Sequence, residues 1–168
     1  MTAAADCPIT MSCMRAFLLA LAFAQSLLPK SSVQQITVIS STSAATAAKG
    51  ETLTLWADVT PNRNIHVYAT DKQGFTPLSL KVVPQPRIVI GKVTYPPAEE
   101  GFTPGIDMMI PLPMYTKPFR VAQPITIAPS AKSGEIVTVA GAINYQACDS
   151  RLCYPATSFP VTWAVTVK

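Results

Sequence analysis

Hydrophobic and polar residues alternate along several short stretches of this chain, which is the pattern of half-buried β-strands. The clearest stretch is Thr52–Val59, in which every second residue is apolar and falls on one face of a strand. Phe159–Val167 alternates in the same way. The apolar faces of the two stretches consist of Leu53, Leu55, Ala57 and Val59, and of Val161, Trp163, Val165 and Val167. Further strands are predicted at Ile65–Thr70, Leu78–Val83, Arg87–Thr94, Ile106–Ile110, Phe119–Ile127 and Glu135–Tyr145.

The residues between these strands favour one fold class. Of the 168 residues 16 are proline, which long helices tolerate poorly but turns and edge strands accept. Pro61–Asn64 predicts a turn that joins the first two strands as a hairpin. The proline-rich segment Tyr95–Pro118 predicts a long surface excursion beside one sheet. About seven to nine short antiparallel strands with such turns predict an all-β, immunoglobulin-like β-sandwich.

The first 24 residues have the features of a cleaved export signal. Arg15 precedes nine apolar residues, which end in the small-residue pattern Ala22-Phe23-Ala24. Such a run is too short to span a bilayer, which needs about 20 residues. Residues 25–49 are rich in Ser, Thr and Ala and predict a flexible leader with one edge strand at Val33–Ile39, followed by a domain over residues 50–168. We therefore expect cleavage near Ala24 and a periplasmic protein.

The charged and metal-binding residues exclude some classes of function. The net charge is +4, from 13 basic and 9 acidic residues, and the basic residues are scattered, so nucleic-acid binding is not expected. His66 is the single histidine, which excludes a multi-histidine metal site. Met108, Met109 and Met114 leave a copper-handling role open, although methionine more commonly fills hydrophobic cores.

Two cysteines near the C-terminus are the strongest chemical signal. Cleavage near Ala24 removes Cys7 and Cys13 and leaves Cys148 and Cys153, which usually pair in an oxidising compartment. In the chain-entropy model such a short loop gains about 2 kcal/mol of stability, against about 5 kcal/mol for a loop of about 100 residues. A short-range disulfide can instead open without unfolding the domain, as a redox carrier requires. The residues alone leave a redox pair, a structural staple and part of a metal site open.

The surroundings of this pair resemble a known family, the periplasmic N-terminal domain of the thiol:disulfide interchange protein DsbD. The segments that carry the resemblance are Tyr145-Gln146-Ala147-Cys148, Cys153-Tyr154-Pro155, Asn64-Ile65-His66-Val67-Tyr68, Gly91-Lys92 and Tyr95-Pro96. The resemblance extends from about Gly50 to the C-terminus. It implies an immunoglobulin-like fold whose cysteine pair carries electrons from a membrane-embedded partner to exported thioredoxin-like proteins.

The resemblance also implies roles for individual residues. Cys148 and Cys153 would be the catalytic pair, with Cys153 forming the mixed disulfide with partners. Tyr68 would lie beside them, with His66 on the same face, and Tyr154 flanks the pair. The loop that shields the cysteines in the family matches Arg87-Ile88-Val89-Ile90-Gly91, so we expect an aliphatic cap there or an aromatic one from Phe102.

The function that these observations favour is thiol–disulfide exchange. We expect a monomer that needs no cofactor and relays electrons between a separate membrane donor and thioredoxin-like exported proteins, a function that the resemblance connects with cytochrome c assembly. The alternative is a binding or adaptor module in which the same disulfide only shapes a recognition loop. The two hypotheses predict different reduction potentials for the cysteine pair.

Overall fold

The computed structural model describes residues 33–102 and 111–168, apart from the side chain of Gln73. The predicted export signal with Cys7 and Cys13, the predicted strand at Ile106–Ile110, and Met108 and Met109 lie outside these residues. Within them the structure is all-β, with twelve strands, one short 3₁₀ helix and no α-helix. Across the same residues no helix has the length and apolar character needed to cross a membrane.

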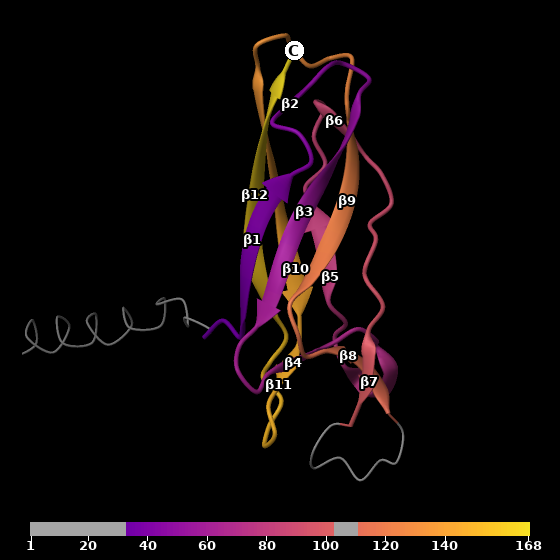
Figure 1. Ribbon diagram of the computed structural model, residues 1–168, viewed down its shortest axis with the longest axis vertical. Helices are drawn as coiled ribbons and strands as arrows, with labels where there is room; N and C mark the ends of the chain where they lie inside the picture. The colour runs from indigo at the N-terminus through magenta and orange to yellow at the C-terminus, as the bar shows by residue number, and fades with distance from the viewer. Residues whose placement is uncertain (1–32, 103–110) are drawn as a thin grey trace, which may run out of the picture. The chain divides into compact units, whose positions relative to one another are not determined.

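Two four-stranded sheets form the body of the domain, which comprises residues 34–168 (Figure 1). The first sheet has the order β1, β3, β9, β6, with the bounds Ile36–Thr42, Thr52–Pro61, Phe119–Ile127 and Ile88–Ile90. The second has the order β2, β12, β10, β5, with the bounds Thr46–Ala47, Thr157–Val167, Ile136–Tyr145 and Ser79–Val82. The pair β2–β12 is parallel, and all other pairs in these sheets are antiparallel.

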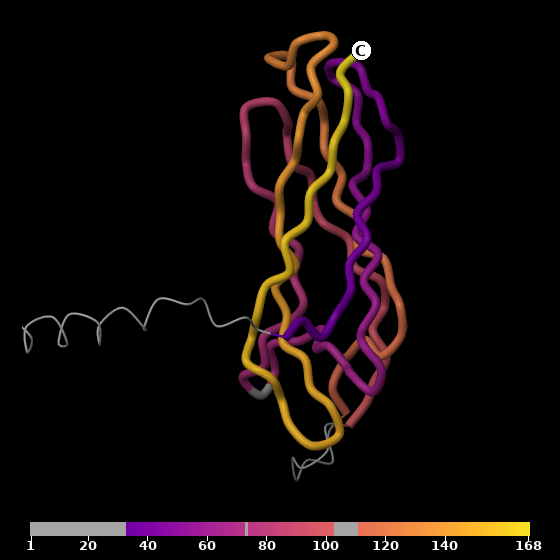
Figure 2. Tube along the Cα trace, turned by 90° about the vertical axis from the view of Figure 1, so that its left-hand side faces the viewer, coloured from indigo at the N-terminus to yellow at the C-terminus, as the bar shows by residue number. Residues whose placement is uncertain are grey.

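The inner faces of the two sheets share one apolar core. The predicted alternation is confirmed, because Leu53, Leu55, Ala57 and Val59 of β3 and Val161, Trp163, Val165 and Val167 of β12 are all buried. They belong to one cluster with side chains from both sheets. Figure 2 separates the layer that contains the yellow β12 from the layer that contains β1 and β3. Alternating burial between two facing sheets defines a β-sandwich, so the predicted all-β, immunoglobulin-like architecture is confirmed.

A third, small sheet closes one end of the sandwich. Its order is β11, β4, β8, β7, with the bounds Ala147–Cys148, His66–Tyr68, Leu112–Tyr115 and Glu99–Gly101. The 3₁₀ helix η2 (Lys72–Gly74) follows β4. In Figure 1 this sheet lies at the end of the domain opposite the C-terminus. The small sheet carries Cys148 and therefore positions the candidate site.

The domain begins before the boundary that the sequence predicted at Gly50. β1 pairs with β3 along its whole length, and Ile36 and Ala47 are buried in the core. The hydroxyl of Tyr145 in β10 donates to Gln34 Oε1 at 2.8 Å and accepts from the backbone N–H of Gln35 at 3.1 Å. The edge strand predicted at Val33–Ile39 is thus present as β1, whereas the rest of residues 34–49 is not a flexible leader, because Ala47 is buried in the core.

Two further predictions differ from the structure. β3 and β4 do not form a hairpin, because the turn at Pro61–Asn64 carries the chain from the first sheet into the small one. The segment Tyr95–Pro118 is not only a surface excursion, since it supplies β7 and β8 and buries Leu112, Met114 and Tyr115. In both cases the partners are distant in sequence, which local patterns do not reveal.

A chain that starts at Gly50 is expected to lose its cooperative fold, whereas a chain that starts at Val33 keeps it. The shorter chain lacks β1 and β2, so it leaves the paired edge of β3 open and uncovers the core around Ile36 and Ala47. Thermal unfolding monitored by circular dichroism, together with gel filtration, compares the two chains. Equal midpoints would show that residues 33–49 are dispensable.

Candidate functional site

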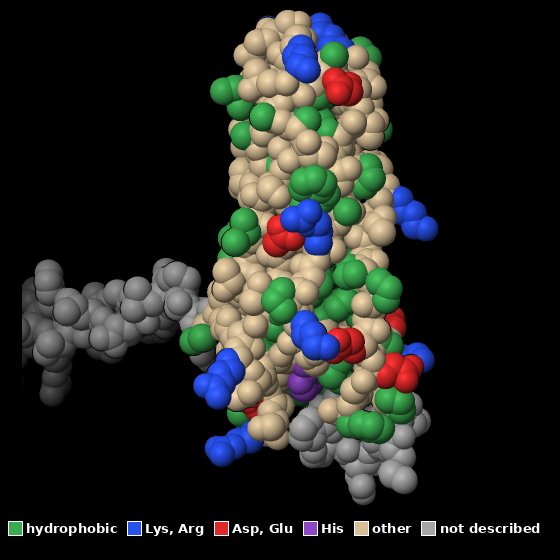
Figure 3. Space-filling model, in the orientation of Figure 1, with side chains coloured by type: hydrophobic (Ala, Val, Ile, Leu, Met, Phe, Trp, Pro, Cys, Tyr) green, Lys and Arg blue, Asp and Glu red, His purple; other side chains and the backbone are tan. Residues whose placement is uncertain are grey.

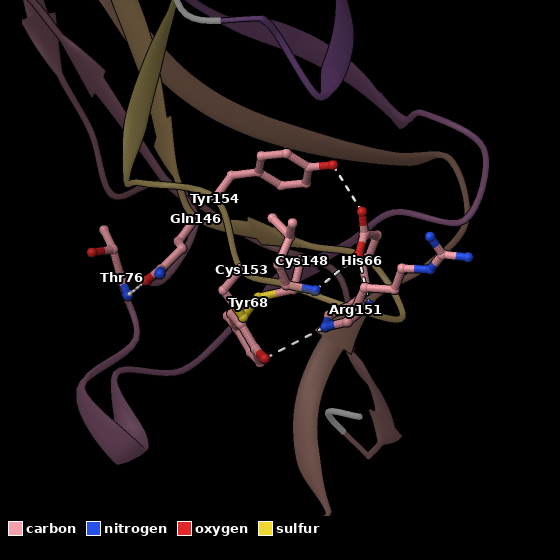
Figure 4. Close-up of a disulfide and its surroundings, with 10 residues drawn as sticks. His66, Tyr68, Thr76, Gln146, Cys148, Arg151, Cys153 and Tyr154 are labelled. Atoms are coloured by element: carbon pink, nitrogen blue, oxygen red, sulfur yellow. Dashed lines mark hydrogen bonds between the residues drawn. A yellow bond between two sulfur atoms is a disulfide. The ribbon is translucent and has the colours of Figure 1, made fainter. Parts of the chain in front are cut away.

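The two C-terminal cysteines form a disulfide at the tip of the domain. β10 passes through Gln146 into β11, which ends at Cys148, and the chain then turns back to Cys153. The sulfur atoms are 1.97 Å apart and the Cα atoms 4.0 Å apart. In Figure 4 the disulfide lies between the cysteine loop and the side chain of Tyr68. The disulfide is local, because it closes one loop and does not connect the two large sheets.

The two sulfur-bearing residues differ sharply in exposure. Cys148 is fully buried, whereas Cys153 is exposed to solvent. Cys148 belongs to a small apolar cluster, separate from the main core, that consists of Tyr68, Leu112, Met114 and Cys148, with Phe75 packed against it. A partner protein can therefore approach Cys153 directly, but it reaches Cys148 only through the loop or the cluster.

β4 brings two predicted site residues to the disulfide. Its antiparallel pairing with β11 places His66 opposite Cys148. The rings of His66 and Tyr68 meet edge to face with centroids 5.4 Å apart, and His66 Nε2 lies 3.4 Å from the Tyr68 hydroxyl. Burial lowers the pKa of His66, and the nearby carboxylate of Asp149 opposes this shift only in part. His66 is therefore an uncharged imidazole at neutral pH, beside the buried sulfur.

Phe75 forms an aromatic wall that the sequence did not predict. Its ring stacks on Tyr68 with centroids 3.9 Å apart and planes inclined by 14°. The adjoining loop is fixed by the backbone N–H of Thr76, which donates to Gln146 Oε1 at 2.9 Å. Gln146 immediately precedes β11, so the loop after η2 is tied to the strand that carries Cys148. No pattern in the sequence singles out Phe75, because its stacking partner is defined only by the fold.

The expected aliphatic cap is not at the site. Ile88–Ile90 forms β6, which pairs with β9 in the first sheet, and Figure 1 shows β6 near the opposite end of the domain from β11. Ile88 is instead part of the main core. The other expected cap, Phe102, follows β7 of the small sheet and has 63% of its surface exposed. The aromatic ring in contact with the Cys148 cluster is that of Phe75.

Asp149 organises the loop between the cysteines. Its Oδ1 accepts the backbone N–H groups of Arg151 at 2.7 Å and Leu152 at 3.0 Å, and its Oδ2 accepts the Tyr154 hydroxyl at 2.8 Å. These bonds lower the pKa of Asp149, while the adjacent carboxylate raises the pKa of Tyr154. The Tyr154 side chain is thus linked to the cysteine loop by its hydrogen bond to Asp149. An Asp followed by a polar turn is a known signal for such a side-chain-capped turn.

The described residues offer little for a metal ion. Among these residues, no three side chains of His, Cys, Asp or Glu lie close enough together to hold a metal ion. Met114, named as a soft-metal candidate, is buried with apolar neighbours in the Cys148 cluster.

Comparisons with known proteins give a family match and a solved structure of low similarity. The family model described as "Thiol:disulfide interchange protein DsbD, N-terminal" matches residues 34–161. No curated protein matches the chain by sequence. A chain in a solved structure of the complex between the DsbD N-terminal and PilB N-terminal domains from Neisseria meningitidis has 16% identity and a TM-score of 0.47, covering 83% of this chain and 88% of that one. The family match includes all of the described site, and the protein belongs to the family of DsbD N-terminal domains.

Proposed function

We propose that this protein is a periplasmic thiol:disulfide exchange protein that passes electron pairs through Cys148 and Cys153. The observation that carries the proposal is the unequal exposure of the two residues in a local disulfide, one buried and one open to partners. Family membership supports the same reaction class, since the family is that of a thiol:disulfide interchange protein. The donor would be a separate membrane protein and the acceptors thioredoxin-like exported proteins.

The reaction consists of two sulfur substitutions. In the reduced protein, the Cys153 thiolate attacks one sulfur of a partner disulfide, and the other partner sulfur leaves as a thiolate. Cys148 then loses its proton and attacks the Cys153 sulfur, which restores the internal disulfide and releases the second partner thiolate. The partner gains two electrons and this protein loses two. The reverse sequence accepts electrons from the donor, and no cofactor is needed.

The geometry supports these different roles of the two cysteines. Exposed Cys153 is accessible for the first attack, and buried Cys148 is held behind it by the pairing of β11 with β4. A mixed disulfide on Cys153 therefore has its resolving thiol already in place. The apolar cluster that contains Tyr68 and Cys148 keeps solvent away from this resolving sulfur.

Because the disulfide closes only a short loop, its reduction is not expected to unfold the domain. Reducing a disulfide that closes so short a loop removes only about 2 kcal/mol of folding stability. This loss is small compared with the stabilisation from burying the sandwich core. The core cluster draws its side chains from both large sheets and does not include either cysteine. The domain is thus expected to keep its fold when the disulfide is reduced.

The reduction potential and a pair of cysteine variants test the proposal. We expect a potential between about −120 and −270 mV, the range of catalytic exchange proteins, and not one below about −300 mV, which marks an inert staple. Cys148→Ala should accumulate mixed disulfides with thioredoxin-like proteins through Cys153, and Cys153→Ala, the matched control, should accumulate few. A potential below the catalytic range with no mixed disulfide in either variant would favour the binding-module alternative.

A second prediction concerns Asp149. Asp149→Ala removes the three hydrogen bonds that hold the cysteine loop and removes a negative charge that opposes a thiolate, so both effects favour the reduced form. We expect the potential to rise by about 30 mV, a tenfold change in the exchange equilibrium. Tyr154→Phe, which loses one of these bonds, should give a smaller rise, and Ser150→Ala should give none. An unchanged potential in Asp149→Ala would contradict the role assigned to this turn.

A further inference from the structure

An open groove of about 420 Å³ lies beside the cysteine loop. One wall is the turn between β3 and β4, which includes Arg63, and the other is the cysteine loop itself, with Asp149, Arg151 and Tyr154. Asp149 and Tyr154 are the residues that directly follow Cys148 and Cys153 in the chain. A molecule in this groove is therefore in contact with the segment that carries the exposed sulfur.

Two guanidinium groups give the groove its charge. Arg63 and Arg151 are both exposed, one on each wall. The ion pairs found among the described residues are Arg87–Glu135, Lys117–Glu99 and Arg120–Asp58, so neither groove arginine is used in one. Figure 3 shows both basic and acidic side chains at the end of the domain opposite the C-terminus, and in Figure 4 the Arg151 side chain extends away from the disulfide.

The single carboxylate in the groove cancels only part of this charge. Asp149 is occupied by two backbone N–H groups and the Tyr154 hydroxyl. The carboxylate is ionised, because these bonds and the charge of Arg151 lower its pKa, so the two arginines and Asp149 leave the groove with an excess of one positive charge. The nearest acidic strand of the small sheet, β7 with Glu99 and Glu100, is separated from β11 by β4 and β8. Glu99 is held there by Thr116 and Lys117.

The turn that carries Arg63 is fixed by its own hydrogen bonds. The backbone N–H of Asn62 donates to Gln35 O at 2.9 Å, and the N–H of Ile65 donates to Asn62 O at 3.0 Å. Asn64 has a φ of 62°, a left-handed conformation that asparagine accepts more readily than most residues. Arg63 therefore projects from a defined turn and not from a freely moving segment.

We infer that this groove receives an acidic side chain of the exchange partner, next to the partner cysteine that bonds to Cys153. The inference rests on the proposed function and specifies its partner: a thioredoxin-like protein with an Asp or Glu close to its reactive cysteine. Guanidinium groups bind carboxylates through paired hydrogen bonds, and a groove of this volume accommodates a side chain with its flanking backbone. The contact would align the partner sulfur and accelerate association.

The test uses two short blocked peptides, Cys-Gly-Glu and Cys-Gly-Gln, which differ by one carboxylate. Each peptide is used in large excess, because one peptide thiol forms a mixed disulfide on Cys153 and a second releases it as the peptide disulfide. The rate at which the Cys148–Cys153 disulfide is reduced is measured at low ionic strength, with dithiothreitol as an uncharged reference. We expect the wild-type protein to react about threefold to tenfold faster with the Glu peptide, since exposed charge pairs typically change an equilibrium or rate by a few-fold each. Added salt should reduce this preference.

Matched variants assign the preference to the groove. Arg63→Gln and Arg151→Gln should each lower it, and the double variant should bring the two peptide rates to within about twofold. Lys132→Gln removes a charge from the loop before β10, outside the groove, and should keep the full preference. A thermal melt of each variant establishes that the fold is intact.

Two results would overturn the inference. Equal rates for both peptides in the wild-type protein, or an unchanged preference in the double variant, would exclude an acidic subsite in this groove. If dithiothreitol and both peptides failed to reduce the disulfide in the folded protein, the exchange function itself would fail. The dithiothreitol rate thus separates the two failures.

Discussion

The antiparallel pairing of β11 with β4 is the contact on which the cysteine site depends. β11 is only two residues long, and it continues β10, a central strand of the second sheet. Its pairing with β4 places Cys148 opposite His66, and the carbonyl of Ala147 accepts the backbone N–H of Tyr154 at 2.8 Å. One short strand therefore fixes the buried cysteine and the return of the loop to the exposed one. The sandwich is the rigid support from which this strand extends.

The site combines a rigid base with a locally organised loop. The base is the Cys148 cluster, with the Tyr68–Phe75 stack as its aromatic side. The loop depends mainly on Asp149, whose hydrogen bonds lie within the loop and on Tyr154. Since the loop is held by its own residues, its covalent state can change with little consequence for the core. This separation is what distinguishes a local disulfide from a bridge between sheets.

The sequence predicted those parts of the fold that depend on local periodicity. The long strands β3, β9, β10 and β12 follow from alternation over about ten residues, since a buried face requires it. The cysteine pair stands out because two nearby cysteines are chemically distinctive, and Tyr154 directly follows one of them. His66 and Tyr68 were expected at the site because of the family resemblance. The strands of the small sheet have two to four residues, too few to show a period, and the partners of β4 and β11 lie far away in the chain.

The predictions that proved wrong concern short segments, whose positions depend on tertiary contacts. The edge strand in residues 34–49 was expected, but the remainder of that segment looked like a leader because serine, threonine and alanine dominate it, although Ala47 is buried in the core. The expected cap at Ile88–Ile90 followed from alignment of short segments, whereas these residues pair with β9. The stacking of Phe75 on Tyr68, and the position of Arg63 and Arg151 on opposite walls of one groove, follow from the tertiary structure alone. No local sequence pattern could have predicted them.

The unequal exposure of the two cysteines also bears on oxidative damage. Peroxide that reaches the reduced protein meets Cys153 first and converts its thiolate to a sulfenic acid. Cys148, sheltered from the same oxidant, is positioned to condense with that sulfenic acid, which yields the disulfide and one water molecule. The product is the ordinary oxidised form, which the electron donor of the proposed exchange would reduce again. The buried cysteine thereby protects its exposed neighbour from irreversible sulfinic and sulfonic acids.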